Sequence, residues 1–250
     1  MSKRQKAQGL TPAVAIISDL LCIPVTLGPG AVAWSTALVY VRHFWAHPYF
    51  WALTLPLPLI IYFSYLVTVV ALRMIIPKMK KGVYASELNR GMLAWYLNLA
   101  LNRSAYVSGL KPLIQSFHFT KFLYWRAMGA KIAFNVNTSI GITLVDLPMI
   151  TIGPGCTIAE NSHISCHTFV GDRLLISPLE IGKNVFLGMN CIVGAGSRIG
   201  DDTTIGAYNK IHGEKIPAGT NMPNFSWEHG SPERVAHELA ALKKQEVAPK

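Results

Sequence analysis

The sequence predicts a parallel β-helix that follows an N-terminal hairpin of two transmembrane helices and a segment of interfacial helices. The β-helix prediction rests on aliphatic residues that recur at every sixth position, most of them followed by a small residue. A hexapeptide period is typical of a β-helix, because each unit supplies one short strand and one corner of a triangular coil. The register positions are Ile152, Ile158, Ile164 and Val170 in a first run, and Ile181, Leu187, Val193, Ile199, Ile205 and Ile211 in a second.

Two long apolar stretches come first in the chain. Residues 13–41 hold Asp19 as their only formally charged side chain, and residues 50–72 hold none. Each stretch exceeds the roughly 20 residues that cross a bilayer core. The Gly-Pro-Gly run at 28–30 is expected to break the first helix, with neighbouring groups satisfying the freed backbone. We therefore expect a transmembrane helical hairpin in residues 1–80.

The basic charge lies in the same half of the chain. Residues 1–127 hold 13 Lys or Arg against 2 Asp or Glu, whereas residues 128–250 hold 10 against 11. The basic residues cluster outside the two stretches, so the positive-inside rule places both termini in the cytoplasm. Basic charge beside a membrane span indicates anionic lipid, and not nucleic acid, as its partner. We expect an integral protein of the inner (cytoplasmic) membrane, with its catalytic domain on the cytoplasmic face.

Residues 81–127 are rich in aromatic and aliphatic side chains with interspersed basic ones. Helical spacing of the apolar positions predicts interfacial amphipathic helices. The same helices could instead cap the open end of the β-helix, and the two roles are compatible. The β-helix is expected in residues 128–222, with about four coils, and a trimer would compensate for the small core.

The C-terminal residues 223–250 are predicted to form a tail with a short helix. Ser231 is a suitable N-cap and Pro232 a suitable first helical residue, and we expect this helix to run to about Lys244.

The hexad period breaks once, between Val170 and Ile181, where the spacing is eleven. A solenoid extrudes extra residues as a loop, and such loops often form the binding face. His167 stands at the start of this excursion, and an imidazole is well suited to deprotonate a hydroxyl or an amine near pH 7. A histidine on a β-helix corner is also an ordinary surface residue, so this pattern alone leaves both roles open.

A zinc site is the metal-dependent alternative. Some β-helix proteins are trimeric carbonic anhydrases of the γ type, in which three histidines bind zinc and a fourth position stays open. His163 is expected to point outward, and with His167 and His212 it would supply such a set. His212 lies at least one coil away, so we expect no metal.

The hexads resemble those of the left-handed β-helix acyltransferases. Residues 181–188, IGKNVFLG, resemble the I-G-x-N-V-W-I-G signature of that family with Phe186 in place of tryptophan, and residues 199–207, IGDDTTIGA, resemble its next repeat. A longer similarity, from about Lys81 to Gly219, is to the membrane-bound acyltransferase-like C-terminal modules of nonribosomal peptide synthetase-like enzymes of the epsilon-poly-lysine synthetase type. It is carried by YWRAMGAKI at 124–132, His167-Thr168-Phe169 with Asp172-Arg173, and GEKIPAG at 213–219.

This resemblance implies a left-handed coil and a homotrimer with its active sites between subunits. It implies transfer of an acyl group from a thioester to a hydroxyl or an amine of a membrane-associated acceptor, with His167 as the general base. Asp146 would orient the imidazole or bind an amine, unless it is a solvated coil corner. The residues expected to contact the acceptor are Asp172, Arg173 and His163.

The donor implied by the resemblance is acyl-CoA or a phosphopantetheine thioester on a carrier protein, bound along the C-terminal coils. Small residues there permit close approach, and lysines would meet phosphates. The expected donor contacts are Gly206, Ala207, Lys210 and Lys215. The rival hypothesis is a non-catalytic trimeric β-helix that serves as a membrane scaffold, and it predicts that His167 is dispensable.

Overall fold

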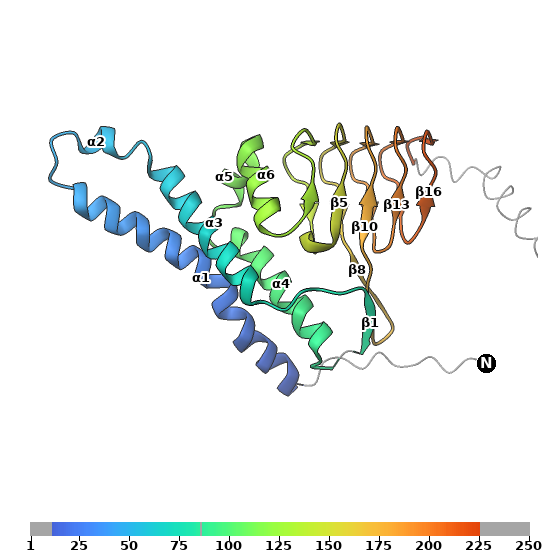
Figure 1. Ribbon diagram of the computed structural model, residues 1–250, viewed down its shortest axis with the longest axis horizontal. Helices are drawn as coiled ribbons and strands as arrows, with labels where there is room; N and C mark the ends of the chain where they lie inside the picture. Colours follow the sequence, from blue (N-terminus) through green and yellow to red (C-terminus); the bar gives the residue numbers. More distant parts are fainter. Residues whose placement is uncertain (1–11, 86, 226–250) are drawn as a thin grey trace, which may run out of the picture.

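A long helical hairpin lies at one end of the molecule and a coil of short strands at the other (Figure 1). The computed structural model describes residues 12–85 and 87–225. The predicted helix between Ser231 and Lys244 lies outside the described residues. The chain passes from the hairpin through three further helices into the coil, so that the two ends of the molecule are joined by a helical layer.

Three parallel sheets form the sides of the coil, as the six-residue spacing predicts. The first sheet contains β2 (Lys131–Ile132), β5 (Ile150–Ile152), β10 (Leu179–Ile181), β13 (Arg198–Ile199) and β16 (Lys215–Ile216). The second contains β3 (Asn137–Thr138), β6 (Thr157–Ile158), β11 (Phe186–Leu187), β14 (Thr204–Ile205) and β17 (Asn221–Met222). The third contains β4 (Thr143–Leu144), β7 (His163–Ile164), β12 (Ile192–Val193) and β15 (Lys210–Ile211).

The third sheet has four strands, and the chain therefore makes four complete coils before β16 and β17 begin a fifth. The predicted inward residues of the second run are all buried, which confirms the register. The prediction of an inward side chain is wrong at one position of the first run. Val170 is 65% exposed, because the chain leaves the coil after Ile164 and Val170 belongs to the excursion.

Glycine allows close stacking at several corners of the coil. A Cβ on Gly188 would lie 2.4 Å from the backbone nitrogen of Ala207 in the next coil. No side chain fits in that space, so glycine permits the strand spacing of the sheets to continue round the corner.

The excursion is a β-hairpin that stands off the coil. Its strands are β8 (His167–Val170) and β9 (Arg173–Ile176), and they pair antiparallel. A third strand, β1 (Gly82–Ala85), pairs antiparallel with the other edge of β9 (Figure 1). The first residues of the segment predicted to be helical are therefore a strand, because the exposed edge of β9 offers them a hydrogen-bonding partner.

The hairpin helices are α1 (Pro12–Phe44) and α3 (Leu57–Ile75), joined by the short α2 (Phe50–Leu53). By length and composition alone, the segments Ile16–Phe44 and Phe50–Ile75 are long and apolar enough to cross a membrane, with mean hydropathies of 1.7 and 2.1. Apolar side chains face outward along both helices, which is the surface that a bilayer would cover.

The expected break at residues 28–30 is wrong, because α1 continues through Pro24 and Pro29. A helix packed along this segment explains the continuity. The Thr26 hydroxyl donates to the Ala100 carbonyl at 3.3 Å, and a Cβ on Gly30 would lie 2.7 Å from Ser108 Cβ. The glycine therefore allows close helix contact, and neighbouring groups hold the proline-containing turn in place.

The remaining helices are α4 (Arg90–Val107), α5 (Lys111–Ser116) and α6 (His118–Ala127). Helix α6 covers the open end of the first coil. The Lys121 ammonium donates to the Thr138 carbonyl at 3.1 Å and to its hydroxyl at 3.0 Å, and burial lowers the pKa of Lys121. Tyr124 and Trp125 are buried in the same apolar cluster as the first coil. The capping role predicted for this segment is thus observed, and contact with lipid stays a prediction.

Candidate active site

The site lies where the chain leaves the coil. Leu144 of β4 pairs with Ile164 of β7, so the residues that follow these strands lie side by side in successive coils. This stacking brings Asp146 next to Cys166 and His167 although about twenty positions separate them in sequence. Asp146 has a left-handed backbone conformation, with φ of 63°, and it precedes the 3₁₀ turn η1 (Leu147–Met149). Aspartate is among the few residues that adopt this conformation at small cost.

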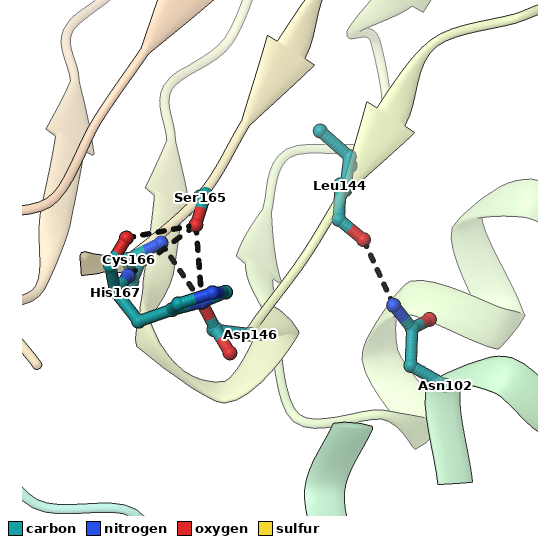
Figure 2. Close-up of polar contacts among 6 residues, drawn as sticks. All are labelled: Asn102, Leu144, Asp146, Ser165, Cys166 and His167. Carbon is teal, nitrogen blue, oxygen red and sulfur yellow. Dashed lines mark hydrogen bonds and ion pairs between the residues drawn. The ribbon is translucent and has the colours of Figure 1, made fainter. Parts of the chain in front are cut away.

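Asp146 and His167 form a close pair (Figure 2). His167 Nδ1 lies 2.5 Å from Asp146 Oδ2. The same oxygen accepts the backbone N–H of Cys166 at 3.0 Å and the Ser165 hydroxyl at 3.5 Å. Ser165 Oγ also lies 3.1 Å from His167 Nδ1. The carboxylate thus holds one ring nitrogen and leaves Nε2 of the imidazole available to a substrate.

Burial distinguishes the two members of the pair. The Asp146 side chain is 0% exposed, whereas the His167 side chain is 21% exposed. A buried carboxylate needs hydrogen-bond donors, and the imidazole and the Cys166 amide supply them. Asp146 is therefore no solvated coil corner. The geometry favours its expected role in orienting the imidazole, because His167 lies between Asp146 and solvent.

Trp95 of α4 forms one wall of the site, a role that its position in the sequence did not indicate. Its ring centroid lies 4.9 Å from that of His167, tilted by 62°, and 5.6 Å from that of Phe169. Trp95 is 6% exposed. Trp95 Nε1 and Asp146 Oδ1 are the only buried side-chain nitrogen or oxygen atoms without a hydrogen-bond partner among residues 12–85 and 87–225. Both atoms belong to residues that contact the same imidazole.

Asn102 lies two helical turns beyond Trp95 on α4 and also contacts the coil. Its Nδ2 donates to the Leu144 carbonyl at 3.0 Å, two residues before Asp146 (Figure 2). Its Oδ1 accepts the Tyr124 hydroxyl at 3.0 Å. Residues seven apart share a helix face. Helical spacing around Trp95 was a signal for this face, but nothing in the sequence showed that the face contacts the coil.

His163 lies beside the pair. It is the outward residue of β7, as predicted. Burial lowers its pKa, the neighbouring His167 lowers it further, and Asp146 acts in the opposite direction.

Cys166 is 0% exposed, and burial raises the pKa of its thiol above the usual range, so its thiolate is not readily formed.

Asp172 and Arg173 lie at the tip of the β8–β9 hairpin. Arg173 pairs with Val170 of β8 and with Ala85 of β1. Val170 is three residues beyond His167, which corresponds to about 10 Å along a strand. The structure thus places these two of the three expected acceptor contacts on the excursion and does not bring them beside the imidazole.

The four expected donor contacts are spread over the last coils. The backbone N–H of Gly206 donates to the Met222 carbonyl at 2.8 Å, and that of Ala207 donates to the Asn224 side chain at 2.8 Å. Residues of the next coil therefore already occupy these two backbone donors. Lys210 lies on the third sheet and Lys215 on the first. The structure does not bring these four residues together within the chain.

The residues of the zinc alternative are also separated. His163 is on β7, and His212 follows β15, which is two strands away in the same sheet. Two strand spacings are about 10 Å, so His163 and His212 are not on neighbouring strands. In the part of the chain that the structure describes, no group of three or more His, Cys, Asp or Glu could hold a metal ion.

A comparison with known protein families also finds the hexapeptide repeat in this chain. Residues 178–213 match the family described as Bacterial transferase hexapeptide (six repeats). This match implies a left-handed coil and supports the enzyme class that the sequence predicts, an acyltransferase. Among curated proteins, no sequence match was found.

Three acetyltransferases are among the solved structures to which part of this chain is similar. A maltose O-acetyltransferase from Clostridium difficile 630 is 19% identical over 48% of this chain and 80% of its own, with a TM-score of 0.38. A hexapeptide-repeat-containing acetyltransferase from Vibrio cholerae is 13% identical over 48% of this chain and 84% of its own, with a TM-score of 0.38. Serine acetyltransferase isoform 3 from Entamoeba histolytica is 14% identical over 79% of this chain and 70% of its own, with a TM-score of 0.30.

Proposed function

We propose that the protein is a membrane-bound acyltransferase that moves an acyl group from a thioester to a hydroxyl or an amine of a membrane-associated acceptor. The observation that carries this proposal is the pair of His167 and the buried Asp146, 2.5 Å apart, where the coil opens into its one hairpin excursion. The hexapeptide transferase repeat at residues 178–213 supports the same chemistry.

His167 acts as the general base in this mechanism. Its Nδ1–H donates to Asp146 Oδ2, which selects the tautomer with an unprotonated Nε2. Nε2 takes the proton of the acceptor hydroxyl or amine as that atom attacks the thioester carbonyl. The carbon–sulfur bond then breaks, and the leaving sulfur receives the proton from Nε2. Asp146 stabilises the imidazolium that exists between these two transfers.

The donor is acyl-CoA or a carrier-linked phosphopantetheine thioester, bound along the outer face of the third sheet. His163, Ile192 and Lys210 form one outward column there, because their strands pair in register. A donor along this column would place phosphate near Lys210 and its thioester near the imidazole. Lys215 faces another side of the coil and would have to come from a neighbouring protomer of the proposed homotrimer.

The membrane hairpin lies in the cytoplasmic membrane with the coil on the cytoplasmic side, where cytosolic thioesters are available. Contacts of α3 support a role beyond anchoring. The Tyr62 hydroxyl donates to the Thr120 carbonyl at 2.8 Å, and the Tyr65 hydroxyl lies 2.7 Å from Ser104 Oγ. The hairpin is thus joined to α4, the helix that carries Trp95, and to α6, which caps the coil.

His167→Ala tests the proposal. Loss of a general base lowers turnover by about 10²–10⁴-fold, and the thiol released from acyl-CoA measures it. His163→Ala is the matched control, since it removes a neighbouring imidazole without the Asp146 contact and should cost much less. Near-normal turnover in His167→Ala, with the oligomer intact, would instead support the non-catalytic scaffold.

A further inference from the structure

A basic pocket lies between the end of the membrane hairpin and the start of α4. It has a volume of about 180 Å³ and is lined by Lys78, Lys80, Tyr84, Arg90 and Gly91. Its lining contains three cationic side chains and no carboxylate. The mechanism proposed for His167 uses none of these residues.

The walls of the pocket are held in place by local contacts. The Tyr84 hydroxyl donates to the Lys80 carbonyl at 2.9 Å. A Cβ on Gly91 would lie 2.1 Å from the Tyr84 ring, so the ring packs directly on the backbone of α4. The Asn89 side chain caps α4 by accepting the N–H groups of Gly91 and Met92, both at 3.0 Å. The linker, β1 and α4 are thus connected around the pocket.

The positive charge of the pocket is not neutralised within the described part of the chain. The ion pairs found among those residues are His167 with Asp146 and Arg198 with Glu180, and neither involves the pocket. The first turn of α4 contains no acidic residue, so the positive end of the helix dipole adds to the same potential. A guanidinium beside two ammonium groups is a suitable set for a phosphate group.

The position of the pocket indicates where the phosphate comes from. Lys78 follows the end of α3 at Ile75 by three residues, so the pocket lies at the membrane surface in the proposed topology. It also adjoins the active site through a sheet. Gly82 of β1 pairs with Ile176 of β9, and Ile176 pairs with His167 of β8. Two strand spacings separate β1 from β8, which is about 10 Å.

We propose that this pocket binds the phosphate of a membrane lipid and thereby holds a phosphate-bearing lipid acceptor at the membrane surface close to His167. The acceptor role rests on the proposed acyltransferase function, whereas the binding of lipid phosphate does not. The lipid tail would lie along the apolar outer surface of the hairpin, and the headgroup would extend across β1 toward the imidazole.

A binding experiment on the full chain tests this pocket. The protein is purified in a maltoside detergent, which contains no phosphate, and titrated with dihexanoyl phosphatidylglycerol, with inorganic phosphate and with coenzyme A. The test variant is Lys80→Glu with Arg90→Glu. A glutamate at position 90 suits the start of a helix, so α4 should persist. The charge-matched control is Lys131→Glu with Lys183→Glu, two exposed residues of the coil.

We expect the pocket variant to bind phosphatidylglycerol at least about tenfold more weakly than wild type, since two charge-assisted contacts are lost, and the control to match wild type. Equal weakening in both double variants would mean that net charge alone attracts lipid, and would overturn the proposal. Unchanged lipid binding in the pocket variant, or a pocket dependence seen only with inorganic phosphate or coenzyme A, would also overturn it. His167→Ala should bind lipid normally, so failure of the acyltransferase mechanism would not be mistaken for failure of the pocket.

Discussion

Asp146→Asn is the most informative change at the site, because it keeps the shape of the side chain and removes its charge. Asp146 Oδ2 accepts from His167 Nδ1 and from the Cys166 amide at 2.5 and 3.0 Å. An asparagine can present either its oxygen or its NH₂ group at this position. If the NH₂ group takes the place of Oδ2, it faces the backbone N–H of Cys166, so that two donors oppose each other. The imidazole must then accept a hydrogen bond at Nδ1, which leaves Nε2 protonated and unable to act as a base.

The alternative orientation also has a cost. With the amide oxygen facing the imidazole, NH₂ occupies the place of Oδ1, which is buried and has no partner among the described residues. An unsatisfied buried donor costs about 1–3 kcal/mol. Because the wild type already leaves Oδ1 unpaired at this place, the free energy of unfolding should fall by no more than that amount. In both orientations the imidazolium loses its negative partner. We expect turnover to fall by about 10²–10⁴-fold, equivalent to roughly 2.7–5.4 kcal/mol of transition-state stabilisation.

Two measurements on the same preparation check this expectation. Release of free thiol from acyl-CoA gives turnover, and denaturant unfolding gives stability. Ser165→Ala is the matched control, because Ser165 contacts the same two groups only at 3.5 and 3.1 Å. It should lower turnover by less than about tenfold, the value of a single modest hydrogen bond. Wild-type turnover in Asp146→Asn would refute the assignment of Asp146 as the residue that orients the base.

Three other perturbations test the coil, the wall of the site and the topology. Val193→Asp should abolish the folded coil, because the position is 0% exposed and an unpaired buried charge costs several kcal/mol. A variant that is soluble on gel filtration and also active would contradict the register. Trp95→Ala should lower the free energy of unfolding by about 3–5 kcal/mol, whereas Trp95→Phe keeps a ring against the imidazole and should cost less; equal losses would argue against the aromatic contact. In intact cells, His47→Cys should react with an impermeant thiol reagent and Lys250→Cys should not; the reverse pattern would separate the active site from cytosolic thioesters.

The hexad pattern was sufficient to predict the coil because its cause is local. Each strand and corner follows from the residues of one unit, so burial of positions such as Ile181 and Ile205 could be predicted without a neighbour. The pattern was wrong at Val170, which keeps the six-residue spacing after the chain has left the coil. Alternation within a β-hairpin strand can place an aliphatic residue at that spacing, and sequence alone does not distinguish the two.

The helical half of the molecule depended more on packing. The Gly-Pro-Gly run at 28–30 was expected to break the first helix, and α1 continues through it with α4 packed against this segment. Helical spacing in residues 81–127 indicated the helices, but β1 is a strand because the edge of β9 pairs with it. In both places a non-local partner overrode the local preference.

The sequence by itself determined a six-residue coil, two long apolar helices and a histidine at the one break in the period. These features follow from spacing and composition, which act over a few neighbouring residues. Only the tertiary structure decided that Asp146 holds this histidine, that Trp95 covers it, and that Asp172 and Arg173 lie elsewhere. Those contacts join residues far apart in sequence, and they depend on how successive coils stack and on where α4 packs against them.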